Sequence, residues 1–289
     1  MKQRLITGIV SALFVIMLLV FTGLGYPGAA SIPMGIVAAI AAYEMMRVSK
    51  CKNKVLTGVS MAAAAVIPAY VDFNFQEYIP VPTSVLVIAY IIVLLAVMLR
   101  NYDTTKFEHV ALAIFGSLII PSSFGTMFTI RDLSFDYPDL FQRSHSVFII
   151  LFAMYCAWIT DTFAYFTGRA LGKRKLAPNI SPKKTVEGAI GGVIGNAIVC
   201  VITFAVFDKF CFVKETVNVW MVIGAAIVIS ILGMVGDLSA SVIKRNFGEK
   251  DFGNLFPGHG GVLDRIDSFL LTMPATYVAV EIGLAIAGK

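Results

Sequence analysis

Nine stretches of mainly apolar residues, each close to the length that crosses a lipid bilayer, constrain this chain more than any other feature. A membrane-spanning helix needs about 20 such residues. The stretches cover, approximately, residues 5–24, 32–47, 55–71, 84–99, 109–130, 146–167, 187–207, 217–238 and 268–287. Only 14% of the residues are charged, against about a quarter in soluble domains. The sequence therefore predicts an all-α, polytopic membrane protein with about nine transmembrane helices.

Basic residues are distributed unequally over the loops that these spans leave on the two sides of the membrane. One side receives 18 of the 23 lysines and arginines. The remaining basic residues, on the other side, are Arg131, Arg143, Lys209, Lys214 and Lys289. Because cytoplasmic loops are rich in Lys and Arg, the pattern predicts a cytoplasmic N-terminus and a C-terminus on the opposite side. We expect an integral protein of a bacterial-type cytoplasmic (inner) membrane.

The first apolar stretch follows Lys2 and Arg4, as the apolar region of a signal peptide would. Its apolar run is longer than the about 7–15 residues of a signal peptide. We therefore expect a retained helix.

Four acidic residues fall within or at the ends of the predicted spans: Glu44, Asp161, Asp237 and Glu281. Carboxylates in a bilayer usually face a cavity, a partner or a metal. Asp161 and Asp237 lie near the inner ends of their spans and are candidates for a site, with capping or pairing at a helix end as the alternative. Glu44 precedes Arg47 by three residues, so an ion pair on one helix face is a sufficient explanation. Glu281, near the outer end, is expected to be structural.

The first of two long cytoplasmic loops, residues 168–187, is basic and is expected to be extended by Pro178 and Pro182. Taken alone, it fits an ordinary cytoplasmic loop or one attracted to anionic lipid. Thr185 is placed to cap the next helix, and a helix N-terminus that faces a phosphate can bind it. Lys183 and Lys184 are therefore candidates for phosphate binding. The next span begins with small residues that permit close helix packing, namely Gly188, Gly191, Gly192 and Gly195.

The second long loop, residues 239–267, combines cations, carboxylates and glycines. Asp264 and Asp267, three residues apart, can share one helix face and hold a hard divalent cation. Glycines free backbone N–H groups to face an anion; here they are Gly258, Gly260 and Gly261. Candidates for phosphate contact are Ser241, Lys244, Arg245, Lys250, His259 and Arg265. The alternative for His259 is a structural role in a turn. The loop predicts a nucleotide and metal site at a membrane surface.

These residues resemble the signature of the phosphatidate cytidylyltransferases, also called CDP-diacylglycerol synthases. The signature is present as Ser241, Lys244-Arg245, Lys250-Asp251, Pro257-Gly258-His259-Gly260-Gly261 and Asp264-Arg265-Ile266-Asp267. Further matches are Gly236-Asp237-Leu238, Asp161 with Ala164-Tyr165 and Gly168-Arg169, and Ile180-Ser181-Pro182-Lys183-Lys184-Thr185 with Glu187-Gly188. These specific motifs cover about the last 130 residues, whereas the first part of the chain matches only as apolar spans.

The resemblance implies a nucleotidyltransferase of phospholipid biosynthesis that converts CTP and phosphatidic acid into CDP-diacylglycerol and pyrophosphate. It implies Mg²⁺ held by Asp237 and Asp264, with Asp267 and Asp161 as further candidates, and K⁺ is also associated with the family. The expected partners are CTP, phosphatidic acid and membrane lipid, without nucleic acid. A homodimer is an open expectation.

The chemistry of this reaction agrees with the types of residue present. A lipid phosphate oxygen attacks the α-phosphorus of CTP, and a phosphate monoester with a second pKa of about 6 is already ionised at pH 7. The obstacle is repulsion between two anions, which cations and a metal relieve. We expect Asp237, Asp264, Lys244 and His259 to carry catalysis.

The sequence also predicts different roles for two regions of the chain. Residues 1–145 are expected to form a scaffold that contributes to a dimer or to a lipid cavity, and residues 146–289 the catalytic region with both basic loops. Two other functions are alternatives: a CTP-dependent lipid kinase of the polyprenol or phytol kinase type, which would release CDP, and an anion transporter. The charges gather at one membrane face, which argues against a transport path.

Overall fold

The computed structural model describes residues 13, 16–22, 26, 28–212, 217–256, 258 and 260–286. Within this part of the chain, eight helices are long and apolar enough to cross a membrane. They correspond in order to the second to ninth predicted spans. The first predicted span, residues 5–24, lies largely outside the described residues. The prediction of an all-α, polytopic membrane protein is confirmed.

The chain divides into two compact units. The first consists of residues 1–128 and 246–266, and the second of residues 129–245 and 267–289. The second long loop of the sequence therefore belongs, from residue 246 to residue 266, to the unit of the N-terminal helices.

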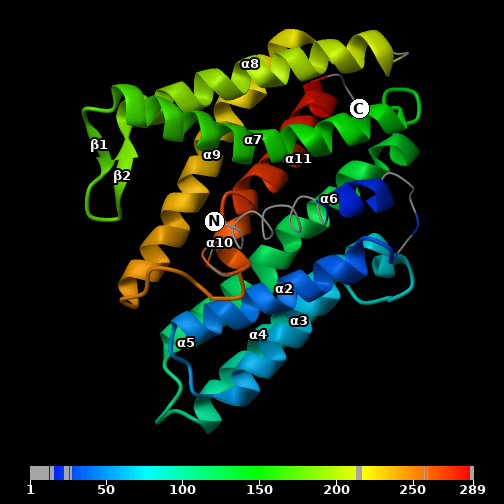
Figure 1. Cartoon of the computed structure of the whole chain (residues 1–289). Coiled ribbons are helices and arrows are strands. Elements are labelled where there is room, and N and C mark those ends of the chain that lie inside the picture. The colour runs from blue at the N-terminus through cyan, green and yellow to red at the C-terminus, as the bar shows by residue number, and fades with distance from the viewer. Residues whose placement is uncertain are drawn as a thin grey trace. The chain divides into compact units, whose positions relative to one another are not determined.

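The first unit is built from helices that follow one another closely in the sequence (Figure 1). They are α2 (Ser31–Val48), α3 (Lys54–Asp72), η1 (Phe75–Glu77), α4 (Thr83–Arg100), α5 (Phe107–Ile114), the π-helical η2 (Phe115–Ile119), the first part of α6 (Ile120–Asp136) and the short α10 (Leu263–Ile266). Helices α2 and α3 pack against each other. The turn between them is stabilised by Asn53, whose Oδ1 accepts hydrogen bonds from the N–H groups of Val55 and Leu56 at 3.0 and 3.1 Å and so caps α3.

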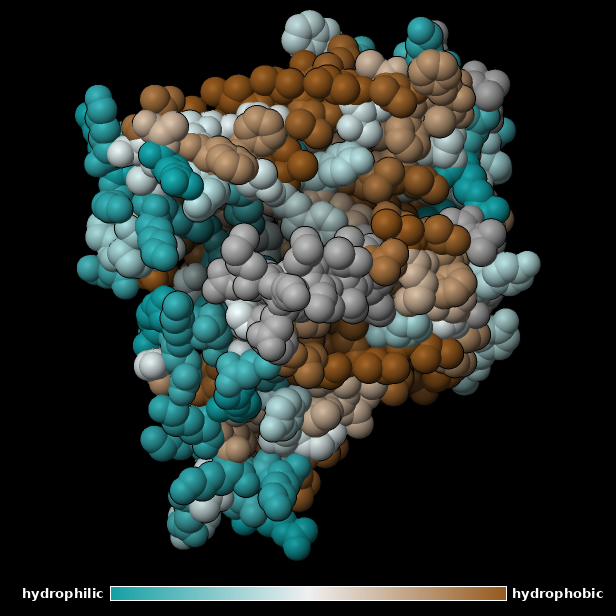
Figure 2. Space-filling view, viewed as in Figure 1, coloured by the Kyte–Doolittle hydropathy of each residue, from teal (hydrophilic) through white to brown (hydrophobic). Residues whose placement is uncertain are grey.

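The second unit is dominated by a long helical hairpin. It contains the end of α6, α7 (Arg143–Leu171), β1 (Lys175–Ala177), β2 (Ser181–Thr185), α8 (Val186–Phe210), nearly all of α9 (Val219–Asn246) and α11 (Phe269–Ile286). Helices α7 and α8 lie side by side (Figure 1), and the antiparallel pair β1–β2 joins them. In Figure 2, hydrophobic residues run along α8, whereas hydrophilic residues gather over this β-hairpin.

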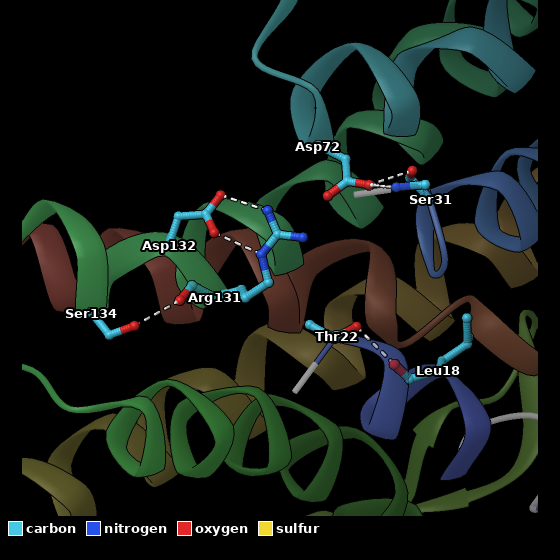
Figure 3. Close-up of polar contacts among 8 residues, drawn as sticks. Leu18, Thr22, Ser31, Asp72, Arg131, Asp132 and Ser134 are labelled. Atoms are coloured by element: carbon cyan, nitrogen blue, oxygen red, sulfur yellow. Dashed lines mark hydrogen bonds and ion pairs between the residues drawn. The ribbon is translucent and has the colours of Figure 1, made fainter. Parts of the chain in front are cut away.

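Two helices extend a few residues beyond the approximate spans predicted from the sequence. The loop at 168–187 was expected to begin at residue 168, but α7 continues to Leu171 and most of the remainder forms the β-hairpin. The fifth predicted span, at about 109–130, also continues further, because α6 extends to Asp136. Here the guanidinium of Arg131 pairs with the carboxylate of Asp132 at 2.6 and 2.8 Å (Figure 3).

The glycines at the start of α8 bring its backbone close to α7, as predicted. A Cβ atom on Gly188 would lie 2.7 Å from the carbonyl oxygen of Ala164, and one on Gly192 would lie 2.7 Å from that of Thr160. Real Cβ atoms are not found so close to a backbone oxygen. The Oγ1 of Thr185 accepts the N–H of Gly188 at 3.1 Å, which confirms the predicted cap.

Replacing Gly192 by alanine should destabilise the second unit, because overpacking costs about 1–3 kcal/mol. The matched control is Gly224→Ala in α9, where an added Cβ would meet no atom within 4 Å. Both changes improve intrinsic helix propensity by about 1 kcal/mol, so we expect a lower Tm for the first variant and an equal or higher Tm for the second. Thermal unfolding in detergent measures both. Equal shifts would contradict the close α7–α8 contact.

Candidate active site

A pocket of about 370 Å³ lies within the second unit, between α7, α8, α9 and the β-hairpin. Its volume is in the range of small-molecule sites. Small residues of the helical hairpin, among them Ala164, Gly168 and Gly188, form part of its lining. Its polar lining consists of Asp161, Tyr165, Arg169, Lys183, Lys184, Thr185 and Asp237.

Three of the predicted acidic residues surround the ammonium group of Lys184. This group forms an ion pair with the carboxylate of Asp237 and interacts electrostatically with Asp161 and Asp267. The Oγ of Ser268 donates to Asp161 Oδ2 at 3.3 Å. The fold therefore brings together Asp161, Asp237, Asp267 and Lys184, which are distributed over more than 100 positions of the sequence.

Burial lowers the pKa of the Lys184 ammonium below its ordinary value. The carboxylates of Asp161 and Asp267 oppose this change, whereas the nearby ammonium of Lys244 adds to it. A buried ammonium gains from anions within reach, and here the carboxylates of Asp161, Asp237 and Asp267 provide them.

The last turns of α9 contribute the other predicted cations of this unit. Lys244 is buried, and the Nε of Arg245 donates to the carbonyl oxygen of Ile180 in the β-hairpin at 3.4 Å. Ser241 follows Asp237 by four residues and so lies on the same helix face.

The remaining predicted residues belong to the first unit, in the segment 246–266. The Oδ2 atom of Asp264 accepts the N–H groups of Phe252 and Gly261 at 2.8 and 2.9 Å. Gly258 and Gly260 have φ angles of +77° and +83°, a backbone conformation that favours glycine. Asp264 and these glycines therefore determine the shape of the loop. The N–H of Gly261 donates to Asp264 inside the loop.

Three further residues of this segment were predicted to contact phosphate: Lys250, His259 and Arg265. The side chains of Lys250 and Arg265 are exposed. His259 lies outside the described residues, so its predicted role is a sequence-based expectation.

The acidic cluster of the second unit has the donor chemistry of a magnesium site. Among the residues that the structure describes, no three His, Cys, Asp or Glu side chains converge so as to hold a metal ion by themselves. Carboxylate oxygens are nevertheless the ligands that Mg²⁺ prefers, and Lys184 provides the cation among them. Asp161, Asp237 and Asp267 offer such oxygens, and their role in binding a metal stays a prediction.

Glu44 is the residue whose role sequence reasoning missed. The expected ion pair with Arg47 does not account for it, because its carboxylate accepts the N–H groups of Val262 and Leu263 at 3.0 and 2.8 Å. An acidic residue in an apolar span was the available signal. Its partners lie 218 and 219 positions away, a separation that no local spacing rule covers.

Comparison with known proteins identifies the family. Residues 2–283 match the model of the Cytidylyltransferase family. The phosphatidate cytidylyltransferase of Bacillus subtilis is 31% identical over 280 residues, which is 96% of each chain. That of Staphylococcus haemolyticus is 47% identical over 132 residues, 46% of this chain and 48% of the relative. The match thus spans about half the length of the staphylococcal relative and nearly all of the Bacillus one.

The chain belongs to the cytidylyltransferase family and is a membrane-embedded nucleotidyltransferase. The resemblance to the phosphatidate cytidylyltransferases is confirmed, and with it the predicted function in phospholipid biosynthesis at the level of the family. The site residues and the metal remain predictions.

Replacing Lys184 by methionine should lower the Tm of the protein, because it leaves three carboxylates close together without their cation. Removing one partner of a buried ion pair costs about 3–5 kcal/mol, and the partial exposure of this pair, 28% and 18% for the two side chains, places the expected loss toward the lower end. Lys183→Met is the control, since the neighbouring side chain is exposed. Equal Tm values for the two variants would contradict the described ion cluster.

Proposed function

We propose that this chain transfers the cytidylyl group of CTP to phosphatidic acid in the pocket of the second unit, with release of pyrophosphate. The observation that carries this proposal is the convergence of Asp161, Asp237, Asp267 and Lys184 at a pocket formed by helices of membrane-spanning length. The family and its relatives supply the class of reaction.

The cationic lining of the pocket provides for phosphate recognition. The guanidinium of Arg169 can bind two phosphate oxygens at once, whereas Lys183 and Lys184 act as point charges. Two phosphate-bearing substrates repel each other, so several cations in one pocket lower the barrier to their approach. The acyl chains of phosphatidic acid stay in lipid while its head group enters from the interface.

The reaction requires alignment more than proton transfer. An ionised oxygen of the lipid phosphate forms a bond to the α-phosphorus, and the bond between that phosphorus and the bridging oxygen to the β-phosphorus breaks. The electron pair of the broken bond leaves with pyrophosphate. Because the nucleophile is already ionised at pH 7, the residues of the chain orient the two phosphates in line and neutralise their charge.

Magnesium fits the same residues. Asp237, with Asp161 and Asp267 beside it, would hold the ion, and the resemblance adds Asp264. When bound, Mg²⁺ supplies positive charge to the triphosphate oxygens and to the departing pyrophosphate. A potassium ion beside it and a homodimeric assembly belong to the same proposal as expectations from the resemblance.

The active site faces the cytoplasm in this proposal. The support is the predominance of basic residues on one side of the predicted topology, 18 of 23, together with the position of Lys183 and Lys184 in a loop on that side. CTP is then available from the cytosol, and no nucleic acid takes part.

An assay with purified protein, phosphatidic acid, CTP and Mg²⁺ tests the function by following pyrophosphate. Release of CDP in its place would favour a lipid kinase. In this assay we expect Asp264→Asn to reduce turnover by about 100-fold or more, because the charge is lost. Folding should be retained, since the amide oxygen of asparagine still accepts the N–H groups that Asp264 accepts. Unchanged turnover at saturating Mg²⁺ would refute the role of Asp264.

A further inference from the structure

Glu44 connects helix α2 to the segment that carries the glycines of the family signature. Its side chain belongs to an apolar helix and is only 3% exposed. One carboxylate oxygen, Oε1, accepts the N–H of Val262 at 3.0 Å, and the other, Oε2, accepts the N–H of Leu263 at 2.8 Å. Both partners belong to the same compact unit as Glu44. The carboxylate therefore serves two successive backbone donors at the start of α10.

Two glycines lie against the same carboxylate. A Cβ atom added to Gly253 or to Gly261 would overlap the carboxylate of Glu44, so these positions admit no larger residue without displacing it. A Cβ atom added to Gly253 would also lie 3.0 Å from the Cα of Gly261. Glu44 thus lies where two parts of the loop, near residues 253 and 261, come together.

Asp264 completes the arrangement from within the loop. Its Oδ2 accepts the N–H groups of Phe252 and Gly261. Two carboxylates, one from α2 and one from the signature, therefore satisfy four backbone N–H groups between residues 252 and 263. Because buried N–H groups need partners, a change that removes one of these acceptor oxygens must alter the loop.

We propose that Glu44 is a positioning residue for the reaction, because it determines the conformation of the described residues 252–256 and 260–264 and thereby the orientation of Asp264 and Arg265. The inference rests on the proposed function, in which these two residues serve the metal and the phosphates. It gives the N-terminal helices a part in catalysis beyond that of the expected scaffold.

The chemistry of the contact makes Glu44→Gln the most informative variant. A glutamine has the size of glutamate but offers a single acceptor oxygen, and its NH₂ group would face a backbone N–H. One of the two hydrogen bonds is lost and a donor opposes a donor. A second variant, Gly253→Ala, pushes on the same carboxylate from the loop side and leaves α2 unchanged.

Asp72 provides a matched control in the same unit. It is a buried carboxylate, 6% exposed, and its Oδ2 accepts the N–H of Gly28 at 2.7 Å and the Oγ–H of Ser31 at 2.5 Å (Figure 3). These partners are local to the start of α2 and the end of α3. Asp72→Asn therefore removes a comparable buried charge without touching the signature segment.

The experiment combines hydrogen exchange of the 252–264 segment with steady-state kinetics for CTP, on the full chain in detergent or lipid nanodiscs. We expect Glu44→Gln and Gly253→Ala to accelerate amide exchange in this segment and to raise the KM for CTP or lower kcat by about tenfold or more, as the loss of outer-shell partners does. Asp72→Asn should lower the Tm while the exchange of the segment and the kinetics stay at wild-type values.

Three outcomes would overturn the proposal. Unchanged exchange in the 252–264 segment of both variants would show that Glu44 does not hold the loop. Faster exchange with wild-type kinetics would show that the loop conformation does not matter for the reaction. Kinetic changes in Asp72→Asn as large as those in Glu44→Gln and Gly253→Ala would show that general destabilisation of the protein explains the kinetic effect. Failure of the wild-type protein to release pyrophosphate is a separate result, which refutes the proposed function and with it the catalytic role of Glu44, whereas the exchange data still test the contact.

Discussion

The cost of placing charged groups next to a membrane is the constraint on which the site depends. A carboxylate or an ammonium that loses water at that position must find a partner of opposite charge. In the second unit Lys184 meets this need for Asp237, with Asp161 and Asp267 near it. In the proposed reaction the same requirement applies to the two phosphate compounds, whose charges need cations in the pocket.

Close packing of the helices supports the cluster. Glycines of α8 bring that helix against α7, so that Asp161 on α7 and Lys184 at the end of the β-hairpin reach one pocket. In the first unit a different carboxylate, Glu44, accepts two backbone N–H groups. The two units therefore use buried acidic residues in two ways, one electrostatic and one as hydrogen-bond acceptors that shape a loop.

Local patterns predicted much of this structure. Runs of apolar residues predicted the second to ninth spans, and Thr185 and the glycines near residue 190 predicted the cap and the close packing of α8. The β-hairpin was not predicted, because the prolines indicate extended chain but not the pairing of Lys175 with Thr185. The contacts of Lys184 and Glu44 depend on tertiary folding, which joins residues far apart in the sequence. The family signature included the acidic residues but did not show which of them interact with the ammonium of Lys184.

The central proposal is that the acidic cluster around Asp237 binds a divalent cation, which would neutralise the phosphates. Binding of Mn²⁺, a spectroscopic substitute for Mg²⁺, measured by electron paramagnetic resonance on the purified protein, tests it most directly. The account predicts saturable binding to the wild-type protein and a large loss of affinity in Asp237→Asn, measured on variant protein whose helical circular dichroism matches that of the wild type. Absence of binding to the wild-type protein, or equal affinity in the two proteins, would contradict it.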